Sequence, residues 1–390
     1  MHIKRNALVL RGGLIIIGLL VLAGCNRGTQ GIFATIEVEE KTATSNLVDN
    51  TSIGGLVKTQ ISAEQYVVLA GTKVFTRTTA GSNWGEIGSP SGLNAIALGG
   101  IDTNADEVAE EVYAAFFDSG ADRYYIYSLT AVSGGGLRWD RVTDTSAWNP
   151  ATGDQITGMA GVGDYLLVSV TDVSVDGDAA NSKVLYRYGS GLGAPDVVGN
   201  FRDSLRDAAR FGTAVVIVGR NTLAAHTSDI DNTNFTGFTD IPNASGVGVI
   251  PSSAPPGVDL FGVTTLSGNV YTSPDGLTWT IAEGSLDRSF SDLTWVEEQG
   301  GFLVVGSKTD EIQNTTRRGY YEVTISGAGP AYSLSYTNDI GDNYTGSELA
   351  ISAIERFQYY PDGTLFALTA GKGLWRTVYP ATGEPRWTWE

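Results

Sequence analysis

The feature that most constrains the fold is an internal repeat of about 50 residues, a length typical of architectures built from stacked small sheets. Its clearest copy reads VYTSPDGLTWT from Val270 to Thr280: a short strand, a Pro-Asp-Gly turn and a tryptophan. Comparable strands begin at Val74, Ile126, Leu185, Ala224, Tyr320 and Leu374, and the turns after them end in Trp84, Trp139, Val197, Phe235, Tyr332 and Trp387. The chain therefore contains seven copies of one unit.

Each copy follows a continuous hydrophobic strand, such as AVVIVG from Ala214, and a still earlier strand, such as ITGMA from Ile156. Four short strands per unit, with no helical period of any length, predict an all-β chain: a seven-bladed β-propeller of four-stranded antiparallel blades. Six or eight blades remain alternatives, because the copy that ends in Val197 lacks its aromatic residue. The units are expected at 51–91, 92–149, 150–200, 201–245, 246–287, 288–340 and 341–390, so the propeller domain spans 51–390.

The end of the last unit bears on how the ring closes. This unit finishes with its own outer strand, RWTWE, at residues 386–390. We therefore expect closure by packing between blades, unless residues 32–40, IFATIEVEE, supply a strand from the other end.

The N-terminus predicts export. A basic start is followed by the apolar run Leu14–Leu22 and then by LAGC, which ends at Cys25. The run is too short and wrongly flanked for a transmembrane helix, and it fits a signal peptide over residues 1–24. Cys25 is the only cysteine, so the chain can form no intrachain disulfide.

The LAGC ending resembles the lipobox of bacterial lipoproteins. This resemblance implies a diacylglyceryl group on the Cys25 thiol and, after cleavage, an acyl chain such as palmitate on its new amine. Residues 25–50 then form a lipid anchor and tether that hold the protein at a membrane of the bacterial envelope. Asn26 in second place favours the outer membrane over the inner, and the side of that membrane stays open.

The central turn of the clearest copy, SPDGLTW, resembles the Asp-box, or BNR repeat, of sialidases and other propellers. Asp275 can accept hydrogen bonds from backbone N–H groups of its own turn, and Gly276 supplies a positive φ. Ser273 belongs to the same turn, and Trp279 can bury its ring between blades. The resemblance implies that this turn lies away from any active centre, so we expect it to serve folding.

The charge of the chain narrows the classes of partner. The formal net charge is −18, and removal of residues 1–24 with Lys4, Arg5 and Arg11 leaves −21. A surface this acidic repels phosphate backbones, so nucleic-acid binding is not expected. It favours solubility and cationic partners.

Catalytic candidates are few. A sialidase-like enzyme uses three arginines, a Tyr–Glu pair and an Asp, but only Arg206 and Arg356 lie in or near expected first strands. Carboxylate chemistry from distant blades, with two carboxylates about 5–9 Å apart, stays an alternative. His226 is expected in a third strand as a packed or solvent-facing residue. Arg202, Arg206 and Arg210 repeat at a spacing of four and are interpreted as inter-blade salt bridges.

Long loops between second and third strands share one face with the blade connections, and loops on rigid scaffolds often carry function. Trp148 and Tyr344 on that face are candidate binding anchors. Asp172, Asp176 and Asp178 lie in one of its loops. Clustered acids suit Ca²⁺, although their spacing does not match an EF-hand loop and no Glu closes it. An ordinary acidic loop is the alternative, and no other metal or cofactor is expected.

Together these features favour an exported, lipid-anchored propeller that acts as a non-catalytic ligand- or protein-binding module, with an unknown protein or glycan ligand. Two alternatives stay open. One is a glycan-active hydrolase or lyase on a sialidase-like scaffold, and the other is a partner subunit in envelope assembly. Aromatic and amide side chains at the channel mouth would favour binding, whereas a carboxylate pair in a pocket would favour hydrolysis.

Overall fold

The computed structural model describes most of the expected propeller domain. The described residues are 47, 52–81, 83–142, 154–171, 183–191, 195–199, 201, 203–220, 224–238, 241–254, 257–282, 289–297, 301–309, 319–328, 331–339, 349, 352–379 and 387–390. They form strands and turns and no α-helix. Within these ranges, none of the chain folds into a helix long and apolar enough to cross a membrane.

The strands form seven sheets, each built from four consecutive strands. The first three sheets hold β1 (Ile53–Thr59), β2 (Gln65–Ala70), β3 (Lys73–Thr78) and β4 (Gly85–Ile87); β5 (Leu93–Ile101), β6 (Glu111–Asp118), β7 (Arg123–Val132) and β8 (Gly136–Arg141); and β9 (Gln155–Val162), β10 (Tyr165–Thr171), β11 (Lys183–Gly189) and β12 (Asp196–Gly199). The next two hold β13 (Leu205–Phe211), β14 (Ala214–Gly219), β15 (Ala224–Thr227) and β16 (Thr236–Phe238), then β17 (Ala244–Ile250), β18 (Leu260–Thr265), β19 (Val270–Ser273) and β20 (Thr280–Ile281). The last two hold β21 (Ser289–Val296), β22 (Phe302–Thr309), β23 (Gly319–Ala328) and β24 (Ala331–Asp339), then β25 (Ile354–Tyr359), β26 (Thr364–Thr369), β27 (Leu374–Val378) and β28 (Thr388–Trp389).

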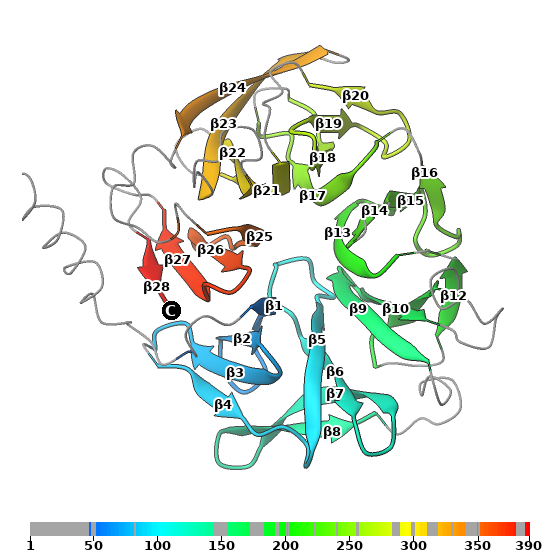
Figure 1. Ribbon diagram of the computed structural model, residues 1–390, viewed down its shortest axis with the longest axis vertical. Helices are drawn as coiled ribbons and strands as arrows, with labels where there is room; N and C mark the ends of the chain where they lie inside the picture. Colours follow the sequence, from blue (N-terminus) through cyan, green and yellow to red (C-terminus); the bar gives the residue numbers. More distant parts are fainter. Residues whose placement is uncertain are drawn as a thin grey trace, which may run out of the picture.

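The sheets stand around a central axis as seven blades (Figure 1). Within each blade, every strand pairs antiparallel with its neighbour in sequence, so the predicted seven-bladed propeller of four-stranded blades is confirmed. One blade boundary was wrong by two residues, because β17 begins at Ala244 rather than after residue 245. In the third copy the buried residue is Val198, while the neighbouring Val197 is 56% exposed, so the anchor lies one position further along than predicted.

The second strand of a blade is buried on both faces. Every residue of β2, β18 and β26 is buried, because neighbouring blades cover both sides of each sheet. One core cluster shows how this works: it joins Leu167 and Leu185 of the third blade to Val215, Ile217 and other residues of the fourth. A single blade could not bury both faces alone, so the stacked ring is the folding unit.

The innermost strand of every blade carries a β-bulge near its start. The bulged residues are Gly54, Ile96, Thr157, Arg206, Ser245, Ser291 and Glu355. The residues that follow them are Gly55, Ala97, Gly158, Asp207, Gly246, Asp292 and Arg356. A bulge bends a strand and re-aims the side chains beside it. Four of the seven following residues are small and three are charged, so the channel has an uneven lining.

Glycine lets the inner strands approach closely. A Cβ at Gly161 in β9 would lie 1.7 Å from the carbonyl oxygen of Gly100 in β5, and one at Gly158 would lie 2.0 Å from that of Leu205 in β13. No side chain fits there, because these contacts are with backbone atoms. The narrow approach between blades 2, 3 and 4 therefore depends on glycine.

The seam between the last blade and the first is closed by side chains. Among the described residues, no strand of one blade joins the sheet of the other. Tyr66 and Trp84 of the first blade share a core with Tyr360 and Phe366 of the last. The Lys58 ammonium lies 2.7 Å from the Asp362 carboxylate across the same seam. This agrees with closure by packing, and residues 32–40 lie outside the described ranges.

The central channel as the candidate functional site

The turn at residues 273–279 has the geometry of a folding device. Asp275 Oδ1 accepts hydrogen bonds from the N–H groups of Leu277 and Thr278, each at 2.8 Å. Ser273 Oγ accepts one from the N–H of Gly276 at 2.8 Å, and Gly276 has a φ of 73°. The indole N–H of Trp279 donates to the Gly276 carbonyl at 3.1 Å. All of these bonds stay within the turn, as the sequence predicts.

Several predicted positions fall outside the described residues: Cys25, Trp148, Asp172, Asp176, Asp178, Arg202 and Tyr344. Their roles stay predictions. His226 lies in the third strand β15, as expected, and is half-buried. Burial lowers the pKa of His226, although the nearby Asp275 carboxylate acts in the opposite direction.

The arginines expected in first strands do link blades. Arg356 in β25 donates a hydrogen bond to Asp207 Oδ1 in β13, so the pair spans the channel between the seventh and fourth blades. Arg206 donates to the Glu355 backbone oxygen and lies 3.3 Å from its carboxylate. Arg210 pairs with Asp164 of the third blade. The interpretation as inter-blade salt bridges is confirmed for Arg206 and Arg210.

Asp292 in β21 is the most unusual group in the channel. Asp292 as a whole residue is only 2% exposed. Its Oδ2 atom accepts a hydrogen bond from the N–H of Phe357 at 2.6 Å, but its Oδ1 atom has no hydrogen-bond partner among the described residues. Burial, and then the neighbouring Asp207 carboxylate, raise the pKa of Asp292 well above its usual range. Such a group calls for an explanation, because most buried polar atoms in proteins have a hydrogen-bond partner.

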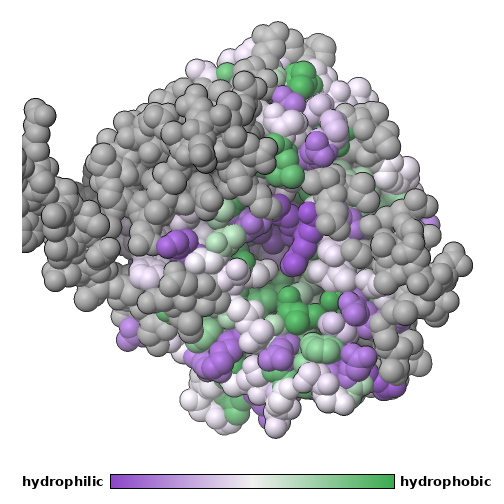
Figure 2. Space-filling view, viewed as in Figure 1, coloured by the Kyte–Doolittle hydropathy of each residue, from purple (hydrophilic) through white to green (hydrophobic). Residues whose placement is uncertain are grey.

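Asp292 is one of the residues that line a cavity of about 480 Å³ in the channel, and its Oδ1 atom is itself buried. The charged residues that line this cavity are Glu107, Asp207, Asp292, Glu297, Arg210 and Arg356. They come from the second, fourth, sixth and seventh blades, and glycine, apolar residues and a few uncharged polar residues complete the wall. Hydrophilic residues gather at the centre of the ring in Figure 2. The sequence did not identify Asp207, Asp292, Glu107 or Glu297 as site residues.

The cavity opens toward the hairpins that join first and second strands. Its lining includes Gly163, Pro251 and Pro361, which follow the ends of inner strands. The turn at 273–279, between third and fourth strands, lies at this same end of its blade. A second cavity, of about 410 Å³, lies at the opposite end and is lined in part by Arg206, Arg220 and Glu355. The channel thus offers a cavity at each end, rather than only on the face of Trp148 and Tyr344.

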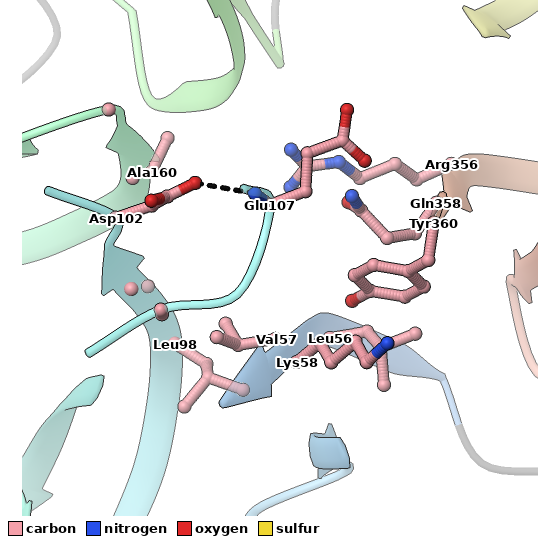
Figure 3. Close-up of a pocket in the computed structure, with 15 residues that line it drawn as sticks. Leu56, Val57, Lys58, Leu98, Asp102, Glu107, Ala160, Arg356, Gln358 and Tyr360 are labelled. Atoms are coloured by element: carbon pink, nitrogen blue, oxygen red, sulfur yellow. Dashed lines mark hydrogen bonds between the residues drawn. The ribbon is translucent and has the colours of Figure 1, made fainter. Parts of the chain in front are cut away.

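The loop between β5 and β6 reaches into the mouth of the larger cavity. The Asp102 carboxylate accepts hydrogen bonds from the N–H groups of Ala105 at 2.8 Å and Glu107 at 2.7 Å, which fixes the loop. Glu107 then faces Arg356 and Gln358 across a smaller neighbouring cavity of about 190 Å³ (Figure 3). Glu107 keeps an exposed surface, but desolvation by the atoms around it, with Asp102 and Glu297 nearby, raises its pKa to about 7.

The same loop contains a group that could hold a metal ion. One oxygen from each of Asp102, Asp106 and Glu110 lies within 4.8 Å of the others. Glu110 also accepts hydrogen bonds from the N–H of Thr103 at 2.8 Å and the side-chain amide of Asn104 at 2.6 Å. The Asp-x-Asn-x-Asp spacing of this loop, which matches the first ligand positions of an EF-hand, is a sequence signal that could have found it.

The fold and the lined channel define the class: the chain is a seven-bladed β-propeller with a charged central channel. No family model and no curated protein matches its sequence. Among solved structures, it is similar to one described as YCF48 bound to D1 peptide, with a TM-score of 0.52, 11% identity, and coverage of 85% of this chain and 93% of that one. It is also similar to YCF48 from Cyanidioschyzon merolae, with a TM-score of 0.54, 9% identity, and coverage of 85% and 97%. At these identities the likeness supports the fold alone.

Two kinds of chemistry fit this arrangement. A buried carboxyl group beside an ion-paired carboxylate can receive a cation, because low polarity strengthens the attraction between opposite charges. Two carboxyl groups in contrasting environments can also divide acid and base roles. The aromatic and amide residues expected for binding are present too, as Trp295, Phe357 and Gln358.

Proposed function

We propose that this protein is an exported, lipid-anchored propeller that binds a protein partner at the bacterial envelope through its central channel. The observation that carries the proposal is the buried carboxyl group of Asp292, a residue that lines the cavity and has one oxygen unpaired among the described residues. A rigid ring that holds such a group ready for a ligand is suited to recognition, because little needs to be ordered on binding.

Two further points support this proposal. The LAGC sequence that ends at Cys25 supports anchoring at a membrane. A solved propeller of similar fold is described as bound to a peptide, so a ring of this kind can present a peptide site. The partner can equally be a component of an envelope assembly, in which case the propeller serves as its docking subunit.

The binding test uses site-specific photo-crosslinking in intact cells. A benzoyl-phenylalanine residue replaces Glu297 at the cavity mouth, Trp148 on the other predicted face, or Glu86, which is exposed on the outer strand β4. We expect one discrete protein adduct from position 297 and none from position 86. Adducts from position 148 alone would move the binding site to the other face, and equal labelling from all three positions would contradict a specific site.

The anchor has a separate test. Cells are grown with an alkyne-tagged palmitate, and the protein is purified and examined for the label. We expect labelling of the natural chain and none of a Cys25→Ser variant. Label retained on the variant would show that Cys25 is not the attachment site.

A hydrolase is the second candidate, because Asp207 and Asp292 line one cavity beside Arg356. In this case Asp292, whose pKa is raised by burial, acts as the acid and Asp207 as the base or nucleophile. The test is release of 4-methylumbelliferone from a panel of glycosides. Turnover that disappears in both Asp207→Asn and Asp292→Asn variants would favour the hydrolase over the binding module.

A further inference from the structure

We propose that the larger channel cavity accepts one primary ammonium group on a flexible apolar stem, such as a lysine side chain, with the ammonium placed against Asp292. This inference rests on the proposed function, because it names the chemical group that the partner inserts. The shared chemistry is an alkylammonium, which can come from a protein lysine or from a free amine.

The charge balance of the cavity favours a cation. Four carboxyl groups line it, Glu107, Asp207, Asp292 and Glu297, against two guanidinium groups. Both guanidinium groups already have partners, because Arg356 pairs with Asp207 and Arg210 pairs with Asp164 outside the lining. Among the described residues this leaves the carboxyl groups of Asp292, Glu107 and Glu297 without a paired guanidinium, and in their ionised form they attract a cation.

The free oxygen of Asp292 favours an ammonium over a guanidinium. A guanidinium binds a carboxylate best through two parallel hydrogen bonds, which require both oxygens. The Oδ2 atom of Asp292 is already held by the N–H of Phe357 at 2.6 Å, so only Oδ1 remains. An ammonium is a compact point charge that can use a single oxygen.

The wall of the cavity suits an alkyl stem. It includes Gly161, Gly248, Val249 and Leu293, which present backbone and aliphatic surface. Such a wall can cover the methylene groups of a lysine, while the charged end lies deeper in the channel. A volume of about 480 Å³ exceeds what one such side chain needs, so water can accompany it.

A small metal ion fits this cavity less well. A protein site for Ca²⁺ offers six to eight oxygen ligands, and one for Zn²⁺ offers three or four nitrogen or sulfur ligands. Within the described part of the chain, the acids of this cavity form no group of three whose oxygens lie together, and only Asp102, Asp106 and Glu110 do so. An organic cation, which needs fewer ligands, is therefore favoured here.

The ionisation of the acids couples ligand binding to pH. Asp292 is faced by Asp207, Arg356 and Arg206, and burial raises the pKa of its carboxyl group well above its usual range. An ammonium bound to Asp292 requires the carboxylate form, so binding releases a proton. Affinity for the cation should then rise with pH.

The experiment measures binding to the purified full chain by isothermal titration calorimetry. The probe is Nα-acetyl-lysine methylamide, and the matched uncharged probe carries an additional acetyl group on its Nε atom. We expect the uncharged probe to bind at least about tenfold more weakly, because it leaves the buried acid without a charged partner. The arginine analogue should also bind more weakly than the lysine probe.

Variants locate the site. Asp292→Asn keeps the size of the side chain and an oxygen for the Phe357 N–H, and we expect at least about a tenfold loss of affinity for the lysine probe. Glu86→Gln on β4 removes the same charge far from the cavity and should leave affinity unchanged. Titrations at pH 7 in two buffers with different ionisation enthalpies should show proton release by the natural chain and none by Asp292→Asn.

If Asp292→Asn does not fold, Glu107→Gln and the pH dependence of the natural chain still decide the question. Equal binding of the charged and uncharged probes, or affinity that does not rise with pH, would overturn the inference. Cadaverine that binds as tightly as the lysine probe supports the alkylammonium site with a free amine as its source. A protein adduct from position 297 that is unaffected by Asp292→Asn would reject this inference while the proposed function stands. Probe binding without any protein adduct would support the alkylammonium site and reject the protein partner of the proposed function.

Discussion

Glu390 accepts a hydrogen bond from Arg77, and both side chains are buried where the last blade meets the first. The two residues are 313 positions apart in the sequence. Glu390 also lies 2.8 Å from Arg376 of its own blade, and it accepts a hydrogen bond from the Trp84 indole at 3.2 Å. One carboxylate thus connects three side chains across the seam of the ring.

We expect Glu390→Gln to lower the free energy of unfolding by about 3–5 kcal/mol, because it removes the counter-charge of the buried Arg77 and of the partly buried Arg376. Urea denaturation followed by circular dichroism measures this. The matched control is Glu86→Gln, which breaks an exposed pair with Lys73 and should cost less than about 1 kcal/mol. Similar losses in the two variants would show that the seam does not depend on Glu390.

The turn at 273–279 should matter for stability and not for binding. Asp275→Ala removes an acceptor from two backbone N–H groups, and we expect a loss of about 0.5–2 kcal/mol, as for comparable capping residues. Affinity for the lysine probe should stay unchanged, because Asp275 does not line the cavity. A fall in affinity without a fall in stability would place this turn in the site.

The close approach of β9 and β5 predicts a steric effect. Gly161→Ala would place a Cβ 1.7 Å from the Gly100 carbonyl oxygen, so the two blades must move apart. We expect the free energy of unfolding to fall by about 2–3 kcal/mol, which is the upper end of the usual cost of overpacking. Gly88→Ala is the control, since a Cβ there meets no atom within 4 Å. Equal thermal stability of the two variants would contradict the close contact between these blades.

The pH dependence of stability should depend on Glu107. Its pKa rises from 4.5 to about 7 on folding, so the folded state favours the protonated form. Its stabilising contribution is therefore full below pH 4.5 and is lost as the pH rises toward 7. The melting temperature of Glu107→Gln should fall less over this range than that of the natural chain. Parallel curves for the two proteins would show that Glu107 titrates normally.

The fold could be predicted because its signals are local. A turn such as Pro274-Asp275-Gly276 and the Trp279 that follows it recur at regular spacing, and each copy can be recognised without knowing its neighbours. The weak third copy was also placed correctly, although its buried residue is Val198 rather than Val197. A hydrophobic side chain is enough to anchor that blade.

The candidate site was harder to predict because it depends on contacts between distant strands. Asp207 and Asp292 read as ordinary polar residues in their strands, and only the register of seven inner strands brings them to one channel. Arg206 and Arg356 were expected near the centre because first strands lie there, but their partners could not be assigned from spacing. The positions favoured on the opposite face, Trp148 and Tyr344 among them, lie outside the described residues.

The bulge shared by all seven inner strands has a consequence for how such a channel can diversify. The residue after each bulge occupies a comparable place in its blade, whether it is Gly55 or Arg356. At Asp207, Asp292 or Arg356 a single substitution can change the charge inside the channel while the outer strands stay as they are, whereas a side chain at Gly158 would collide with the Leu205 backbone. The charge of the channel can therefore change at some of these seven positions without a change in the ring, so propellers with the same ring can bind quite different ligands.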